Sequence, residues 1–188
     1  METSCEICLS GSGGQGLILA GIILARAATD EGKNVIQTQS YGPEARGGAC
    51  RSEVIISNEE IDYLTVEKPD ILLSLTRESY ERYQSRVKDG GIIVVDSSCK
   101  IGRKGENLRI YPIIKTVREV LGTEFVANIM ALGAITALTK IISPNYVKGA
   151  IAVQVPPHTV DLNLKAFALG YEMVQKDEDS KKEAVVEG

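Results

Sequence analysis

The chain has 188 residues, of which 44% are hydrophobic and 24% are charged, and its formal net charge is -4. This balance is typical of one compact globular domain and excludes a disordered chain. The negative charge gives no electrostatic reason to expect binding of nucleic acid or of an anionic membrane. No apolar run reaches the roughly 18 residues that would span a bilayer. Because the N-terminus also lacks a signal-peptide pattern, we expect a cytoplasmic protein.

The chain opens with a predicted strand at Ser4–Leu9, a glycine-rich turn and a helix at Gln15–Glu31. This helix is apolar nearly all round and rich in small residues, which indicates that it is buried and packs closely. Gly32 ends the helix, and a second strand follows at Asn34–Gln39. We expect these elements to form a β-loop-α-β unit with a right-handed crossover.

A third strand is expected at Cys50–Ser57, where two kinds of residue alternate. Arg51, Glu53 and Ile55 share one face, and smaller or apolar residues share the other. The pattern predicts a strand that is half-exposed, or that turns one face to a polar site or a partner.

Later segments predict a sheet followed by helices. Continuous apolar runs at Pro69–Thr76 and Gly91–Ser98 are typical of parallel strands, and an amphipathic helix separates them at Arg77–Lys88. A last strand is expected at Leu108–Ile113. Helices are then expected at Thr116–Leu121, Phe125–Lys140, Pro144–Val153 and Val160–Gln175. The predicted fold class is α/β, with a Rossmann-like, mostly parallel sheet flanked by helices and a helical C-terminal third.

The domain organisation predicted from this pattern is simple. Residues 1–176 are expected to form a single α/β domain. Residues 177–188 form a charged tail, which we expect to fray or to remain disordered.

Cysteine and histidine usage gives no case for a metal site. Cys5 and Cys8 are three residues apart in a predicted strand, which sends them to opposite faces. Cys50 and Cys99 are isolated, so no second pair exists to complete a zinc or iron–sulfur site. We interpret all four as reduced structural thiols. The single histidine, His158, is interpreted as a surface or capping residue.

The glycine-rich turn between the first strand and the first helix is the first candidate site. Its spacing matches the dinucleotide fingerprint, in which glycines let a ligand approach and the helix N-terminus presents free N–H groups. The second strand, however, ends at Gln39, without the acid that would bind a ribose or the arginine that would bind a 2′-phosphate. No Lys-Ser/Thr pair follows, which argues against a P-loop. The turn is therefore a ligand or interface loop, or else only a close-packing turn. The candidate residues are Gly11, Gly13, Gly14, Gln15 and Gly16.

The second candidate segment follows the second strand and so belongs to the same carboxyl edge of the sheet. A guanidinium there is a planar fork that suits carboxylate or phosphate. Glu44 and Arg46 either fasten the loop to its own domain, or Arg46 is held ready for an anion or a partner subunit. The candidate interface or anion-contact residues are Tyr41, Glu44, Arg46, Gly47 and Gly48.

Asn128 is the third candidate, because it interrupts an apolar helix. A buried amide needs hydrogen-bond partners. We expect Asn128 to tie a backbone segment in place, as a supporting polar residue, rather than to touch a ligand.

Five segments then occur in a distinctive order: GSGGQGLILAGIILARAA, QTQSYGPEARGGACRSEVIIS, PDILLSL, VANIMALGA and LNLKAFALGYE. Together they resemble the gamma subunit of 2-oxoacid:ferredoxin oxidoreductases, over nearly the whole chain up to about Glu172. The resemblance implies a Rossmann-like α/β fold. It also implies an enzyme that oxidatively decarboxylates a 2-oxoacid, passes the acyl group to coenzyme A and passes electrons to ferredoxin.

The resemblance further implies how the work is divided among subunits. Thiamine diphosphate and Mg²⁺ are held by alpha and beta subunits, and iron–sulfur clusters lie in other subunits, including a ferredoxin-like one. The gamma subunit packs against the thiamine-bearing core, has no catalytic residue of its own and is expected to be inactive in isolation. Pyruvate-type members tend to carry two arginines followed by Gly-Ala-Pro at the second segment. The run from Glu44 to Ala49 looks more like the 2-oxoglutarate type.

One hypothesis joins the two glycine-rich segments. The Gly11–Gly16 turn and Arg46 would lie at a subunit interface near the thiamine site, where they seal the pocket or contact the phosphates of coenzyme A. Two alternatives stay open at this point. They are a free-standing NAD(P)-dependent oxidoreductase and an anion-binding regulatory module.

Overall fold

The computed structural model describes residues 4–41, 49–102, 105 and 107–186. Within these residues, six strands form one sheet: β1 (Ser4–Ser12), β2 (Asn34–Tyr41), β3 (Ala49–Ser57), β4 (Ile71–Ser74), β5 (Ile92–Asp96) and β6 (Leu108–Tyr111). The order across the sheet is β2-β3-β1-β4-β5-β6. Only β3 runs against the others, so the predicted mostly parallel α/β sheet is confirmed.

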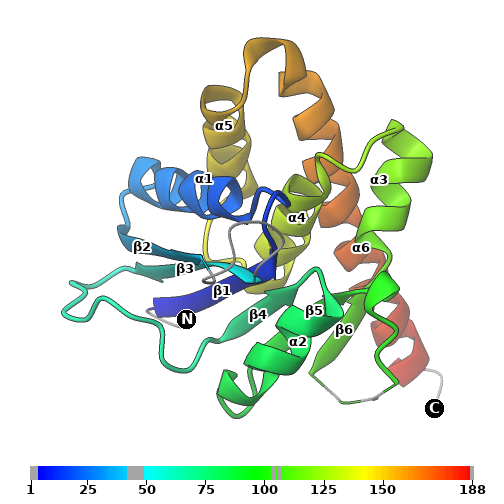
Figure 1. The fold of residues 1–188 in the computed structure, drawn as a ribbon, viewed down its shortest axis with the longest axis horizontal. Coiled ribbons are helices and arrows are strands. Elements are labelled where there is room, and N and C mark those ends of the chain that lie inside the picture. The colour runs from blue at the N-terminus through cyan, green and yellow to red at the C-terminus, as the bar shows by residue number, and fades with distance from the viewer. Residues whose placement is uncertain (1–3, 42–48, 103–104, 106, 187–188) are drawn as a thin grey trace.

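Helices cover both faces of this sheet (Figure 1). Their bounds are α1 (Leu17–Asp30), α2 (Arg77–Tyr83), α3 (Ile113–Leu121), α4 (Ala127–Thr139), α5 (Pro144–Gln154) and α6 (Val160–Val186). Helices α1, α4 and α5 lie on one face, and α2 lies on the other. The helical C-terminal third is likewise confirmed.

The strand order shows that the expected β-loop-α-β unit is split by another strand. β1 and β2 run in the same direction but are not neighbours, because β3 lies between them and pairs antiparallel with both. The physical reason lies in the side chains. Val54, Ile55 and Ile56 are buried on β3, which suits a central strand, whereas Gln39 and Ser40 near the end of β2 are exposed and suit an edge.

The prediction that β3 is half-exposed is wrong, because β3 lies inside the sheet and most of its described residues are buried. The alternative, a face turned to a polar site, is the one observed. Glu53 is only 5% exposed and is paired with Arg51 and Arg86. The opposite face carries Ser52 directly beneath α1, where a Cβ on Gly21 would lie 2.1 Å from the Ser52 hydroxyl oxygen.

Helices α4 and α6 cross at unusually short range. A Cβ atom added at Gly133 would lie 2.1 Å from the carbonyl oxygen of Phe167, and one at Gly170 would lie 1.9 Å from that of Met130. Since these contacts are with backbone, neither glycine can carry a side chain without moving a helix. The crossing therefore fixes α4 and α6 against each other.

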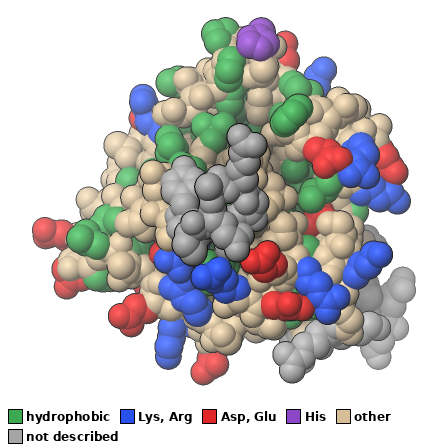
Figure 2. Space-filling model, in the orientation of Figure 1, with side chains coloured by type: hydrophobic (Ala, Val, Ile, Leu, Met, Phe, Trp, Pro, Cys, Tyr) green, Lys and Arg blue, Asp and Glu red, His purple; other side chains and the backbone are tan. Residues whose placement is uncertain are grey.

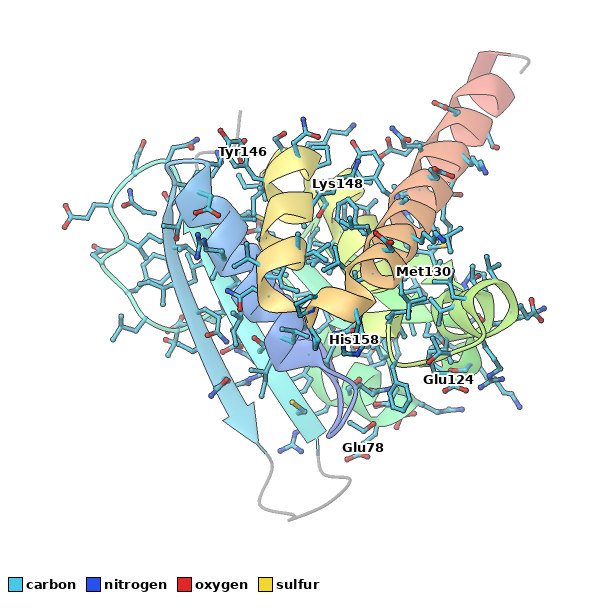
Figure 3. The ribbon with its side chains drawn as sticks, turned by 90° about the horizontal axis from the view of Figure 1, so that it is seen from above. Glu78, Glu124, Met130, Tyr146, Lys148 and His158 are labelled. Atoms are coloured by element: carbon cyan, nitrogen blue, oxygen red, sulfur yellow. The ribbon has the colours of Figure 1, made fainter. Side chains whose placement is uncertain are left out.

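Helix α6 is longer than expected, because the residues predicted to form a frayed tail continue it to Val186. Side chains beyond Gln175 anchor it: the Tyr111 hydroxyl donates to Asp177 over 3.0 Å, and Lys140 pairs with Glu178 at 3.6 Å. Figure 3 shows the end of α6 projecting past the other helices. None of the helices in the described part of the chain has the length and apolar character needed to cross a bilayer.

Candidate functional site at the carboxyl edge of the sheet

The glycine turn lies where β1 ends and α1 begins, at the edge where the parallel strands reach their carboxyl ends. Gly14 and Gly16 have φ angles of 91° and 71°, in the region that side chains rarely adopt. Gly13 and Gly14 are exposed at the tip of the turn. The turn therefore presents its backbone, not side chains, to whatever approaches this edge.

Gln15 holds the turn closed from inside. The side-chain oxygen of Gln15 accepts a hydrogen bond from the backbone N–H of Ser12 at 2.8 Å. The backbone N–H of Gln15 in turn donates to the Ser12 carbonyl at 3.3 Å. A Cβ on Gly11 would lie 2.3 Å from that side-chain oxygen. A side chain at Gly11 would therefore displace the Gln15 side chain from this contact.

The N-terminus of α1 has no side-chain cap, because its N-cap residue is Gly16. Its first turn also contains no acidic residue. The unpaired N–H groups of a helix start, together with the helix dipole, favour a negative charge or an acceptor oxygen.

Asn128 supplies a second, independent observation at the same place. Its side chain is 3% exposed, and its amide nitrogen donates to the Gly16 carbonyl at 2.9 Å, so it makes the predicted backbone tie. Its amide oxygen is buried and has no partner among the described residues. A buried acceptor left unpaired costs about 1–3 kcal/mol, so this oxygen calls for a donor from outside the described residues.

The same geometry argues against a dinucleotide. In the Rossmann arrangement the second strand lies next to the first and brings its acidic residue to the ribose. Here β3 separates them, which moves the end of β2 away from the glycine turn by about another 4.8 Å. Gln39, the residue at that end, is exposed and uncharged. NAD(P) recognition is therefore disfavoured by strand order as well as by residue type.

The second candidate segment lies largely outside the described residues. Glu44, Arg46, Gly47 and Gly48 all fall in 42–48, so their roles stay predictions. Its ends are placed: Tyr41 closes β2 and pairs with Cys50 of β3. The segment therefore leaves and re-enters the sheet at the edge that carries the glycine turn.

A cluster on the other face of the sheet was missed by the sequence analysis. Glu53 of β3 meets Arg51 at 3.5 Å and Arg86 at 3.2 Å, and three guanidiniums surround the ring of Tyr83. The strand alternation placed Arg51 and Glu53 on one face. No sequence signal connected them to Tyr83, Arg82 and Arg86, because that contact depends on how α2 packs against β1.

Thiol chemistry is disfavoured throughout the chain. All four cysteines are buried as reduced thiols. Cys5 packs in the core beneath α1 and Cys8 packs beneath α2, which confirms their opposite faces. Burial raises the pKa of Cys8 to about 12 and that of Cys99 to about 11, so both are protonated at neutral pH.

The described residues offer little to a metal ion. Among them, no group of three or more His, Cys, Asp or Glu side chains is placed to hold one. His158 is exposed in the short turn before α6, which confirms its surface position, and Figure 3 shows it there, apart from Glu78 and Glu124.

Comparison with known proteins settles the family. Residues 6–173 match the family described as pyruvate ferredoxin/flavodoxin oxidoreductase. The chain belongs to this oxidoreductase family. Among its relatives, the 2-oxoglutarate synthase subunit KorC of Methanocaldococcus jannaschii is 47% identical over 91% of this chain and 94% of its own length.

Solved structures of the oxidoreductase family agree in fold. The gamma subunit of a keto/oxoacid ferredoxin oxidoreductase from Geobacter sulfurreducens is 45% identical, with a TM-score of 0.82 over 92% of this chain and 99% of its own. A 2-oxoglutarate:ferredoxin oxidoreductase from Magnetococcus marinus matches with a TM-score of 0.84 at 24% identity. There this chain covers only 32% of the longer chain, so the same fold recurs as part of a larger polypeptide.

Proposed function

We propose that this chain is the gamma subunit of a 2-oxoglutarate:ferredoxin oxidoreductase. The complex would convert 2-oxoglutarate and coenzyme A to succinyl-CoA and CO₂, with both electrons passed to ferredoxin. The proposal is supported by relatives named 2-oxoglutarate synthase subunits, at 40–47% identity over nine-tenths of the chain or more. A Magnetococcus marinus relative in fold was solved with 2-oxoglutarate, coenzyme A and succinyl-CoA bound.

The described residues of this chain do not fit the metal-dependent cofactors of such a complex. Its cysteines are buried on different faces, and the described residues hold no cluster of three metal-binding side chains. We therefore assign thiamine diphosphate, Mg²⁺ and the iron–sulfur clusters to partner subunits. The partners would be thiamine-binding alpha and beta subunits and a ferredoxin-like subunit.

The glycine turn is this chain's contribution to a coenzyme A site that it would share with the partner subunits. The observation that carries this assignment is the uncapped start of α1 beside the unpaired oxygen of Asn128. Coenzyme A offers phosphates for the N–H donors and amide N–H groups for a lone acceptor. Arg46 would supply a guanidinium to the same phosphates. Binding, not bond-making, is the role proposed for these residues.

Reconstitution tests the proposed function. The chain would be co-expressed with the alpha, beta and ferredoxin-like subunits, and ferredoxin reduction would be followed with 2-oxoglutarate, pyruvate and indolepyruvate. We expect kcat/KM to favour 2-oxoglutarate by about 100-fold or more, since a site that pairs a second carboxylate rejects substrates lacking it. A complex that prefers another oxoacid would contradict the substrate, and a chain that joins no complex would contradict the whole proposal.

A variant at the second segment tests the coenzyme A contact. Arg46→Ala should raise the apparent KM for coenzyme A about tenfold and leave the KM for 2-oxoglutarate unchanged, because one charge-assisted contact is lost. Arg26→Ala is the matched control, since Arg26 is exposed on α1 and pairs with Asp30 within its own helix. If Arg46→Ala changes neither that KM nor assembly, Arg46 makes no such contact.

A further inference from the structure

Three arginines surround one tyrosine on the face of the sheet opposite α1. The guanidinium carbons of Arg51, Arg82 and Arg86 lie 5.5, 5.8 and 6.0 Å from the centre of the Tyr83 ring. The ring itself is 8% exposed and packs with Cys8 and Leu72. We call Arg51, Arg82, Arg86 and Tyr83 the arginine platform.

The platform carries an excess of positive charge. Glu53 is the single carboxylate paired with it among the described residues, and it is shared by Arg51 and Arg86. Arg82 is exposed and has no carboxylate partner in that part of the chain. Three cations against one anion leave two positive charges on the platform, in a chain whose net charge is -4. Figure 2 shows basic side chains in the lower half of its face, interspersed with acidic ones.

The structure holds the two inner guanidiniums in fixed positions before anything binds. Arg86 donates to Glu53 and to the carbonyl of Val66, and Arg51 leans on both Glu53 and the ring. Stacking on an aromatic face is strongest for arginine among the cations, because its guanidinium is planar and weakly hydrated. Groups that are already ordered lose little side-chain entropy on binding, so their remaining N–H donors bind a partner at low cost.

We propose that the arginine platform docks a carboxylate-rich surface of a partner subunit. This inference rests on the proposed function, in that it presumes a multi-subunit complex, but it concerns a different face from the glycine turn. Ser52, next to Arg51 on β3, points to α1, so Arg51 points away from α1 and toward α2. Arginines and buried aromatics are enriched at protein–protein contacts, and excess charge of one sign selects a partner surface of the other.

Three carboxylates, Glu53, Glu78 and Glu81, bear on the charge of the platform. Glu78 and Glu81 also belong to α2, and Arg77 pairs with Glu81 at 2.8 Å, which neutralises that pair. Glu53 is buried beneath the arginines and not available to a partner. Glu78 is exposed on α2 and offsets part of the excess, so the net outward-facing charge of the platform stays positive and is carried by guanidiniums.

Arg82→Glu is the variant that tests this docking, because Arg82 is exposed and supports no ion pair among the described residues. Arg77→Glu is the matched control on the same helix. Association with the purified partner subunits would be measured at about 50 mM and about 400 mM NaCl. We expect Arg82→Glu to raise Kd about tenfold or more at low salt, with a smaller difference at high salt, since like charges would then meet. The control should stay within about twofold of the wild type.

The outcomes separate the docking from the proposed function. If the wild-type chain joins the complex and Arg82→Glu joins it with the same Kd and the same salt dependence, the docking proposal is overturned and the proposed function stands. If the wild-type chain joins no complex, both fall. Inorganic pyrophosphate provides a further arm: binding to the isolated wild-type chain that Arg82→Glu abolishes, with assembly unchanged, makes the platform a phosphate site and also overturns the docking.

Discussion

Gly133 and Gly170 bring two helix backbones together, whereas Gly11 and Gly16 bring a turn against side chains. In the crossing of α4 and α6, an added Cβ would meet carbonyl oxygens at 2.1 and 1.9 Å. In the glycine turn, it would meet the ends of Gln15 and Asn128 at 2.3 and 2.5 Å. A backbone carbonyl within a helix cannot move alone, but a side chain can rotate. The first region is therefore built for rigidity, and the second can adjust to a ligand or a partner.

Gly133→Ala disrupts the crossing of α4 and α6 and should cause the largest loss of stability. The helices must separate or shift, and we expect a loss of about 3 kcal/mol in the free energy of unfolding, at the upper end for overpacking. Urea denaturation measures it. Gly149→Ala is the control, because its Cβ meets nothing within 4 Å in α5 and should stabilise the chain by about 0.5–1 kcal/mol. A loss below about 1 kcal/mol for Gly133→Ala would show that the crossing adjusts easily.

Gly16→Ala tests the adjustable region. The substitution strains a backbone at φ 71° and pushes on the Asn128 amide, so we expect a loss of about 2 kcal/mol. Asn128→Ala alone should cost about 1 kcal/mol, the usual value for one hydrogen bond. The double variant lacks the Asn128 amide with which the added Cβ would clash. Its loss in the free energy of unfolding should therefore be smaller than the sum of the two single losses. Full additivity in urea denaturation would mean that Asn128 and Gly16 are not coupled.

This difference also marks what the sequence could reveal. Hydrophobic periodicity located the strands and most helices, because it reports burial along each local segment. Strand order could not be obtained that way: β3 enters the sheet between β1 and β2 through pairing between distant residues. The length of α6 was missed because Asp177 and Glu178 look like a solvated tail until Tyr111 and Lys140 are placed beside them.

The candidate site likewise has features that could be predicted from local sequence and contacts that could not. The glycine turn and the need of Asn128 for a partner followed from residue types and context. That its partner is the Gly16 carbonyl, 112 residues earlier, did not. The arginine platform could not be predicted from the sequence, because Arg51 and Arg82 come together only through the packing of α2 on the sheet. Local chemistry was readable, and contacts between distant segments were not.

Alkaline pH tests the sheet on which both regions rest. Burial, and to a smaller extent the negative charge of Glu53, raises the pKa of Cys8 from 9.0 to about 12. Between these values the unfolded thiol ionises and the folded one stays protonated, so stability falls as pH rises, by about 1.4 kcal/mol per pH unit. Urea midpoints at several pH values above about 9 would measure this, and Cys8→Ala should show a shallower slope. Equal slopes would mean that Cys8 is not the group responsible.

Gly14→Ala should have the smallest effect on stability and gives the clearest separation of turn from site. Gly14 has φ 91° with open space at its Cβ, and Gly32, at the far end of α1, has φ 83° with equally open space. Both alanine variants should therefore lose about 1 kcal/mol from backbone strain alone. Only Gly14→Ala should raise the KM for coenzyme A in the assembled complex, because only Gly14 lies in the turn that we propose as a coenzyme A contact. If the two variants show the same KM, the tip of the glycine turn makes no contact with coenzyme A, and its glycines serve packing alone.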